Sequence, residues 1–365
     1  MTATDTPEMD FSVDPLLIDS VTRLLSDTCT FDAVQAAEEA GWAPEIWQSV
    51  AEAGYPWIGL PVEAGGSGGT LRDAVEVIRL AGAHAAPIPL AETMLTGGWL
   101  LTEAGLELPD GPVTVVPGTS ADTLEGRLDG ADLVINGDAH RVPWAGQADR
   151  IAVLIPVRGA QMVASVLPGE VVIASMANVA GEPRPTVHVR DVRIPIDRVA
   201  PVDHPRVGDQ LRLRGALGRT AAMAGALEAM SRLTVDYTDQ RHQFGRPVSR
   251  FQAVQQHLVW GAQDAALASM AATVAAAHAE VDVLGAGFQI AAARAVTEEV
   301  ASTATRWAHQ AHGAMGMTQE YALHHLSRRL WSWRHEFATP GEWRSAVGRM
   351  AEAAGPDGLY PLIAS

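Results

Sequence analysis

Residues 237–255 read Tyr-Thr-Asp-Gln-Arg-His-Gln-Phe-Gly-Arg-Pro-Val-Ser-Arg-Phe-Gln-Ala-Val-Gln, and this stretch decides how the chain is interpreted. It separates two long alanine-rich segments, Gln210–Tyr237 and Phe251–Val283, and a third follows at Gly285–His312. Small residues on all sides of these segments predict helices that pack closely on several faces, as in a bundle with subunit contacts. The planar guanidinium of Arg241 suits a pair of phosphates, and Gln243 adds a donor nearby.

The chain before this region consists of two parts, the first with helical patterns and the second with strand patterns. The first hundred residues predict helices at Pro15–Leu25, Glu45–Ala53 and Thr70–Ala83. Six of the eleven residues in 59–69 are Gly or Pro, which predicts a loop between helices. From Pro112 to Val202, short β-branched runs are punctuated by Gly, Pro, Asn and Asp, which predicts a barrel or sandwich.

The order of these segments predicts an α+β fold in three parts. Residues 1–111 are expected to form an N-terminal helical domain, and residues 112–205 a central β-barrel or sandwich. Residues 206–365 are expected to form a C-terminal four-helix bundle. A length of 365 residues agrees with two to three domains of ordinary size.

Charge and composition exclude several classes of protein. The formal charge is −17, which argues against a nucleic-acid binder and against binding to anionic membrane surfaces. All 26 basic residues are Arg, so Schiff-base lysine chemistry and a P-loop are excluded. The longest stretch without charged residues, Ala265–Ala279, is too short to span a bilayer.

Cysteine and histidine usage predicts a reducing compartment and no metal site. The single Cys29 excludes an intrachain disulfide framework and a cysteine metal cluster. His324, His325 and His335 lack a carboxylate at metal-ligand spacing. Residues 1–11 carry acidic residues and no basic segment, so we expect no secretory signal and a cytoplasmic protein.

Four segments, taken in order, resemble the acyl-CoA dehydrogenase family across nearly the whole chain. Residues 241–252 resemble the family's Arg-x-x-Phe-Gly…Phe-Gln segment, and residues 310–321 resemble its Gly-rich loop that ends in Glu-Tyr. The Gly-rich residues 59–68 and the strand-like residues 187–195 also have counterparts in the family. Any one of these motifs is weak, but four in register make the resemblance strong.

The resemblance implies FAD as cofactor and an acyl-CoA thioester as substrate. It assigns cofactor-binding positions that reach the FAD of a neighbouring subunit: Arg241, Gln243, Phe244, Gln252, Gln310, Gly313 and Ala314. From the residues alone, Arg241 is also open to an ion pair with Asp239 or Asp236, and Gln310 is equally open to a role as a helix cap. Family analogy also implies electron-transferring flavoprotein as the electron acceptor.

The catalytic base departs from the family pattern. The reaction needs a carboxylate that removes the substrate α-proton while flavin accepts the β-hydride. An ungapped register from Gly316 places the usual base on Phe337, with Glu336 one residue earlier. Glu336 is the candidate base, and its other interpretation is a solvated carboxylate beside Arg334. A second position used by some members lies between Gln210 and Leu227, where the chain has no acidic residue.

The predicted β-domain departs as well. The family's flavin-facing Trp-Ile-(Thr/Ser) falls on Arg141-Val142-Pro143, and Pro143 offers neither a hydroxyl nor an N–H. Residues 116–122 are a poor match to the segment that normally contacts the flavin ring. Trp144 is open to two interpretations, a flavin-stacking residue or a core tryptophan.

This asymmetry resembles one subunit of the heteromeric α2β2 acyl-CoA dehydrogenases of actinobacterial sterol catabolism. We therefore expect a base-lacking subunit that desaturates acyl-CoA thioesters together with a homologous partner, in lipid or sterol side-chain β-oxidation. One alternative is a self-sufficient homotetramer that uses Glu336. Another is an oxidase or monooxygenase of the same fold, which fast reoxidation of reduced flavin by O2 would indicate.

Overall fold

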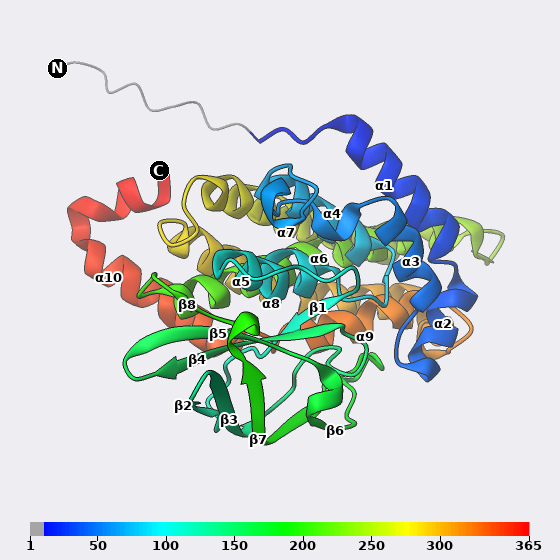
Figure 1. Cartoon of the computed structure of the whole chain (residues 1–365). Helices are drawn as coiled ribbons and strands as arrows, with labels where there is room; N and C mark the ends of the chain where they lie inside the picture. The colour runs from blue at the N-terminus through cyan, green and yellow to red at the C-terminus, as the bar shows by residue number, and fades with distance from the viewer. Residues whose placement is uncertain (1–10, 365) are drawn as a thin grey trace.

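The computed structural model describes residues 11–364. The expectation of no secretory signal depends largely on residues 1–10, which lie outside the described residues. Within the described range, none of the helices has the length and apolar character needed to cross a bilayer. Apart from the short hairpin at residues 242–247, the strands gather on one side of a helical body (Figure 1).

The N-terminal region is helical, as the sequence predicts. Its α-helices are α1 Pro15–Thr28, α2 Phe31–Ala40, α3 Pro44–Glu52, α4 Leu71–Ala83 and α5 Gly98–Glu103. Single turns of 3₁₀-helix at Tyr55–Trp57 and Val62–Ala64 and a π-helical segment at Glu92–Gly97 complete it. The predictions for α1, α3 and α4 are confirmed, whereas α2 and α5 were not expected.

Local signals explain where these helices begin and end. Thr70 caps α4 through a reciprocal pair of hydrogen bonds with Asp73, which forms a capping box. Thr30 caps α2, and Gly41 ends it in the left-handed conformation. The Gly-rich stretch forms the predicted loop, and a side chain at Gly66 would overlap the carbonyl of Leu60. That close approach requires glycine.

The central region is a sandwich of two four-stranded sheets. One sheet has the order β1-β4-β5-β8 and the other β2-β3-β7-β6. The strands are β1 Val113–Val115, β2 Glu125–Asp129, β3 Asp132–Ala139, β4 Arg150–Val157, β5 Ala160–Val166, β6 Val172–Ala174, β7 Thr186–Pro195 and β8 Val199–Val202. All pairs are antiparallel except β1 and β4, which pair in parallel from Val113 opposite Arg150. Alternate residues of both sheets form one apolar core between them.

The C-terminal region is a bundle of long helices. These are α6 Val207–Gln240, α7 Gln252–Val281, α8 Gly287–His312, α9 Leu323–Trp333 and α10 Pro340–Ala364, which kinks at Gly355. A two-residue hairpin, β9 His242–Gln243 and β10 Arg246–Pro247, joins α6 to α7. The three long helical segments expected from alanine content correspond to α6, α7 and α8, so those predictions are confirmed.

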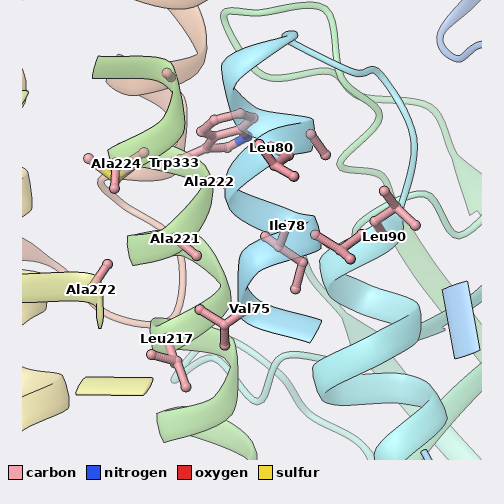
Figure 2. Close-up of a cluster of buried hydrophobic side chains, with 14 of the residues drawn as sticks. Val75, Ile78, Leu80, Leu90, Leu217, Ala221, Ala222, Ala224, Ala272 and Trp333 are labelled. Carbon is pink, nitrogen blue, oxygen red and sulfur yellow. The ribbon is translucent and has the colours of Figure 1, made fainter. Parts of the chain in front are cut away.

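Small residues let α4 approach α6 closely, which joins the N-terminal helices to the bundle (Figure 2). A side chain at Gly82 would overlap the carbonyl of Ala222, and one at Gly225 would overlap the carbonyl of Arg79. Apolar side chains such as Ile78 and Leu217 fill the space around this contact. The position of α6 is therefore fixed by backbone-to-backbone packing.

Candidate functional site

A cleft of about 650 Å³ lies where the β-sandwich meets the first turns of α6. One wall is the loop between β1 and β2 (residues 116–122), and a second is the loop between β3 and β4 (residues 140–143). Residues 335–339, between α9 and α10, form a third wall. Residues 208–212 of α6 form the fourth wall of the cleft. The segments that depart from the family pattern therefore meet around one cavity.

The two loops from the β-domain are held by internal hydrogen bonds. Asp122 accepts hydrogen bonds from the backbone N–H and hydroxyl of Thr119, at 2.6 and 2.9 Å, and from the N–H of His140 at 2.7 Å. Pro143 accepts a hydrogen bond from the Thr114 hydroxyl through its carbonyl. Trp144 is 2% exposed, so it is a core tryptophan and not a cleft residue.

Glu336 lines the cleft but is held by two guanidinium groups. Its carboxylate accepts a hydrogen bond from Nε of Arg184 at 2.7 Å and another from Nε of Arg219. Burial alone would raise the pKa of Glu336, but the two arginines outweigh burial and lower the pKa to about 2. The interpretation of Glu336 as a solvated carboxylate beside Arg334 is wrong, because its side chain is 8% exposed and paired elsewhere.

The pairs of Glu336 belong to a longer buried row of charges, which we call the charged row. Arg219 also binds Glu92 of the π-helical segment, and Arg184 also binds Glu182 at 3.0 Å. Glu182 in turn accepts a hydrogen bond from the indole N–H of Trp333 at 2.9 Å. The charged row thus joins the N-terminal helices, the β-domain, α6 and α9. A π-helical turn at such a place is common near functional sites.

Phe337 occupies the position to which the ungapped register assigns the base. Its ring lies against α6 so closely that a side chain at Gly215 would overlap ring carbons Cδ1 and Cε1. Gly215 belongs to the segment of α6 that holds the alternative base in some members of the resembled family. The ring at the position that the register assigns to the base therefore contacts a glycine of the segment in which some members carry the alternative base.

The other acidic residues of the cleft are engaged as well. Glu342 accepts hydrogen bonds from the N–H and hydroxyl of Thr339, both at 2.7 Å, at the start of α10. These hydrogen bonds lower the pKa of Glu342. With Asp122 and Glu336 also bound, each carboxylate that lines the cleft within residues 11–364 is held by donors of this chain.

A second group of predicted residues lies at the other end of α6. Arg241 ends that helix, and Gln243 and Phe244 follow on the hairpin, where all three side chains are exposed. Phe244 is 92% exposed. In the described part of the chain Arg241 forms no ion pair, and Asp239 instead accepts a hydrogen bond from Ser249 at 3.0 Å.

Aromatic packing brings the remaining predicted residues to the same end of the bundle. Tyr237, near the end of α6, stacks on His312 at the end of α8 with ring centroids 4.5 Å apart. Tyr321 packs on both rings at 5.3 and 5.2 Å. The exposed positions beside this cluster are Gln252, Gln310, Gly313 and Ala314. We call this end of the bundle, with the hairpin, the hairpin face.

The cleft and the hairpin face cannot serve one ligand in one chain. Arg212 lines the cleft and Arg241 ends the same helix, 241 − 212 = 29 residues later. At 1.5 Å per residue they are about 44 Å apart along the axis of α6. None of the residues of the hairpin face lines the cleft. Within one chain the cleft and the hairpin face are therefore two separate groups of residues.

The histidine pair meets a carboxylate that the sequence pattern did not reveal. Glu38, from α2, lies with His324 and His325 so that their ligand atoms are within 4.8 Å of one another. Glu38 also accepts hydrogen bonds from His325 at 2.8 Å and from Arg328. Burial alone would raise the pKa of Glu38, but these partners lower it to about 2, so its charge is already balanced by cations of this chain.

Sequence reasoning missed the pairing of the charged row, of which Arg184 and Glu336 line the cleft. Arg184, Arg219 and Glu92 come from three separate segments, and their pairing has no local pattern in the sequence. One signal was present: Arg219 interrupts an apolar stretch of α6 in which every residue from Gly215 to Leu227 is buried. A buried arginine of this kind requires a buried carboxylate partner.

Comparison with known proteins shows which proteins share the sequence pattern and the fold. Residues 213–334 match the family model described as the acyl-CoA dehydrogenase C-terminal domain. Acyl-CoA dehydrogenase IpdE2 of Mycolicibacterium smegmatis is 28% identical over 316 residues, covering 84% of this chain and 89% of the relative.

Two solved structures share the fold over nearly the whole chain. The ChsE4-ChsE5 complex from Mycobacterium tuberculosis has a TM-score of 0.86 at 21% identity, covering 95% of this chain and 100% of that one. A variant of the Tcur3481-Tcur3483 steroid ACAD has a TM-score of 0.81 at 19% identity, covering 93% and 98%. The expected fold class is thus confirmed.

These findings place residues 213–334 with the acyl-CoA dehydrogenase C-terminal domain and show that the whole chain resembles acyl-CoA dehydrogenases in sequence and in fold. The family consists of oxidoreductases that act on CH–CH groups. The resemblance drawn from residues 241–252 and 310–321 is confirmed. The roles of individual site residues, including Glu336 and Arg241, stay predictions.

Proposed function

We propose that this chain is the base-lacking subunit of a heteromeric, FAD-dependent α2β2 acyl-CoA dehydrogenase. It works with a homologous subunit to desaturate an acyl-CoA thioester in lipid or sterol side-chain β-oxidation. The observation that carries the proposal is that each carboxylate lining the cleft within residues 11–364 is held by donors of this chain, which leaves no free base there. The cleft also lies about 44 Å from the hairpin face along α6, so a ligand that needs both kinds of residue must lie between two subunits.

The hairpin face suits the phosphate-bearing part of FAD. Arg241 presents several N–H donors in a planar fork, and Gln243 and Gln310 add neutral donors at the same end of the bundle. All three side chains are exposed, and their donors are unpaired within residues 11–364. The positive φ of 60° at Gly313 keeps the neighbouring surface free of a side chain. FAD, when bound, supplies the hydride acceptor.

The cleft suits the flavin ring less well. In the β3–β4 loop, Pro143 has no N–H, and its carbonyl already accepts the Thr114 hydroxyl. Trp144, the neighbouring aromatic residue, is buried in the core. In the proposed assembly, the residues of this chain therefore bind and orient the cofactor through the hairpin face.

The state of the acidic residues in the cleft supports the proposal that the catalytic base belongs to the partner subunit. A general base should have a pKa near the working pH, whereas the pKa of Glu336 is about 2. Glu336 is also directed between two arginines, and Phe337 fills the usual position. The α-proton of the thioester is then removed by a carboxylate of the homologous subunit, and electrons pass to electron-transferring flavoprotein.

The relatives support the heteromeric assembly. One similar structure is a complex of two named chains, ChsE4 and ChsE5, and another, the Tcur3481-Tcur3483 steroid ACAD, also carries a double name. IpdE2 is named as an acyl-CoA dehydrogenase. A subunit that keeps the residues reaching towards a neighbour and lacks a free base fits an assembly of that kind.

The test is to purify the full chain alone and co-expressed with an adjacently encoded homologue, and to record native mass and visible spectrum. We expect the chain alone to be colourless and the co-purified complex to be yellow. Arg241→Ala should lower the FAD retained by the complex, whereas Arg23→Ala, an exposed arginine on α1, should not. A full flavin complement in the isolated chain would overturn the proposal.

One observation favours a second candidate, a self-sufficient homotetramer: Glu336 is a carboxylate that lines the cleft. In that case the isolated chain holds FAD and acyl-CoA reduces it. Glu336→Gln would then abolish flavin reduction while FAD stays bound. Reduction at an unchanged rate in that variant would reject Glu336 as base.

A further inference from the structure

The cleft ends abruptly along α6. Gly208, Leu211 and Arg212 line it, but Gly215, the next residue on the same side one turn later, lies beneath the ring of Phe337. The ring is so close that even a methyl group at Gly215 would overlap it. Phe337 therefore forms the inner end of the cleft and depends on the missing side chain of Gly215.

A second, much smaller cavity lies behind this end. It has a volume of about 30 Å³ and is lined by apolar residues such as Ile78 and Leu90 together with Arg184 and Arg219. Arg184 lines both the cleft and this inner cavity, so the charged row lies between them. An apolar chain that passed from one cavity to the other would have to separate buried ion pairs, which is costly.

The backbone at this point is strained and held from both sides. Phe337 has φ of 56° and Ala338 has φ of 110°, a region that residues with side chains disfavour. On one side, Arg294 donates hydrogen bonds to the carbonyls of Trp333 at 2.6 Å and Glu336 at 3.2 Å. On the other side, α10 begins with the cap between Thr339 and Glu342. Strain that is held in place on both sides commonly marks a functional position.

We propose that Phe337, seated on Gly215 in front of the charged row, is the specificity-determining residue of this cleft. It acts as a stop that limits the cleft of this chain to short acyl groups and excludes long apolar chains. This inference rests on the proposed function, because it takes acyl-CoA thioesters as the ligands. It adds that this chain's own cleft is closed to long acyl chains, in addition to lacking a base.

The test measures the affinity of the isolated full-length chain for unreactive thioether analogues of butyryl-, octanoyl- and palmitoyl-CoA by calorimetry. For the native chain we expect the three dissociation constants to agree within about threefold, because the added methylenes stay in water. Phe337→Ala should tighten binding of the palmitoyl analogue at least about tenfold, because each newly buried methylene contributes about fourfold. Binding of the butyryl analogue should stay within about threefold.

Phe288→Ala is the matched control, because Phe288 is a half-buried phenylalanine at the start of α8 that does not line the cleft. It should leave all three affinities unchanged. Gly215→Ala alone should lower the thermal midpoint by displacing the ring, and Gly215→Ala with Phe337→Ala should recover it. That rescue reports the contact itself, independently of ligand binding.

Three results would overturn the inference. The first is that the native chain binds the palmitoyl analogue much more tightly than the butyryl analogue. The second is that Phe337→Ala leaves the ratio of their two dissociation constants unchanged. The third is that no analogue binds to the native chain or the variant. The proposed function is judged separately, by whether FAD is retained when the chain is co-purified with its homologue, so the two failures are distinguishable.

Discussion

Replacing Glu336 with glutamine preserves the size of the side chain and removes one negative charge from between two buried guanidinium groups. In the charged row, Glu92, Glu182 and Glu336 pair with Arg184 and Arg219, and Arg329 lies 3.4 Å from Glu182 as a third cation. Glu336 contacts both Arg184 and Arg219. Breaking a buried ion pair by removing one partner typically costs about 3–5 kcal/mol, because the remaining charge stays buried. Unfolding entropy of about 2.1 cal/mol/K per residue, over 365 residues, converts this cost to a decrease of about 4–7 °C in Tm.

The pH dependence of this loss follows from the direction of the pKa shift. Glu336 has a pKa of about 2 in the folded chain and an ordinary value of 4.5. Because the folded-state pKa is depressed, the stabilisation is fully present above pH 4.5 and is lost as pH falls through about 2. The difference in free energy of unfolding between native chain and variant should therefore be constant from neutral pH to about pH 5 and should shrink below that.

Urea unfolding followed by tryptophan fluorescence, repeated across this pH range, measures the effect. Glu352→Gln is the matched control, since Glu352 is exposed on α10 and has no ion pair within the described residues. It should change stability by less than about 0.5 kcal/mol. The reasoning is refuted if Glu336→Gln behaves like this control at neutral pH, or if its effect grows as the solution becomes more acidic.

Three further outcomes follow from other parts of the molecule. Gly225→Ala should destabilise the chain by about 3 kcal/mol or more in urea unfolding, because the new methyl group overlaps the carbonyl of Arg79. Gly348→Ala, in open space on α10, should be neutral or stabilising by up to about 1 kcal/mol. In the isolated chain, Arg241→Ala should leave Tm within about 1 °C, since the side chain is exposed and unpaired in the described range, and a clear drop would show an unrecognised structural contact. Burial raises the pKa of Cys29 from 9.0 to about 11, so alkylation with iodoacetamide at pH 8 should be about 100-fold slower than for a free thiol, and a normal rate would contradict that shift.

The sequence was sufficient to predict the order of a helical, a strand-rich and a second helical region, because those signals are local, although α2 and α5 were not expected. Caps, glycine-rich turns and alanine-rich helices at Gln252–Val281 and Gly287–His312 each lie within one segment. The exposed hairpin with Arg241 was also recognisable, since its motif is contiguous. The family followed from four such segments in the right order.

The pairing of the charged row was not predictable in this way. Glu336 meets Arg184 from 152 residues away and Arg219 from 117 residues away, so no window of the sequence contains the contact. The ring of Phe337 on Gly215 is likewise a contact between distant segments. Its sign in the sequence is the glycine at position 215, and that glycine cannot be told apart from any other glycine in a helix rich in small residues.

The length of α6 has a consequence for how this chain can change over time. One continuous helix of 34 residues begins at the cleft and ends at Arg241, so a single rigid element carries residues of both the cleft and the hairpin face. Substitutions near Gly215 alter the end of the cleft, whereas substitutions near Tyr237 alter the hairpin face. After a gene duplication, substitutions can remove residues needed for chemistry at one end of α6 while selection keeps the residues at the other end. The two ends of the helix then change at different rates.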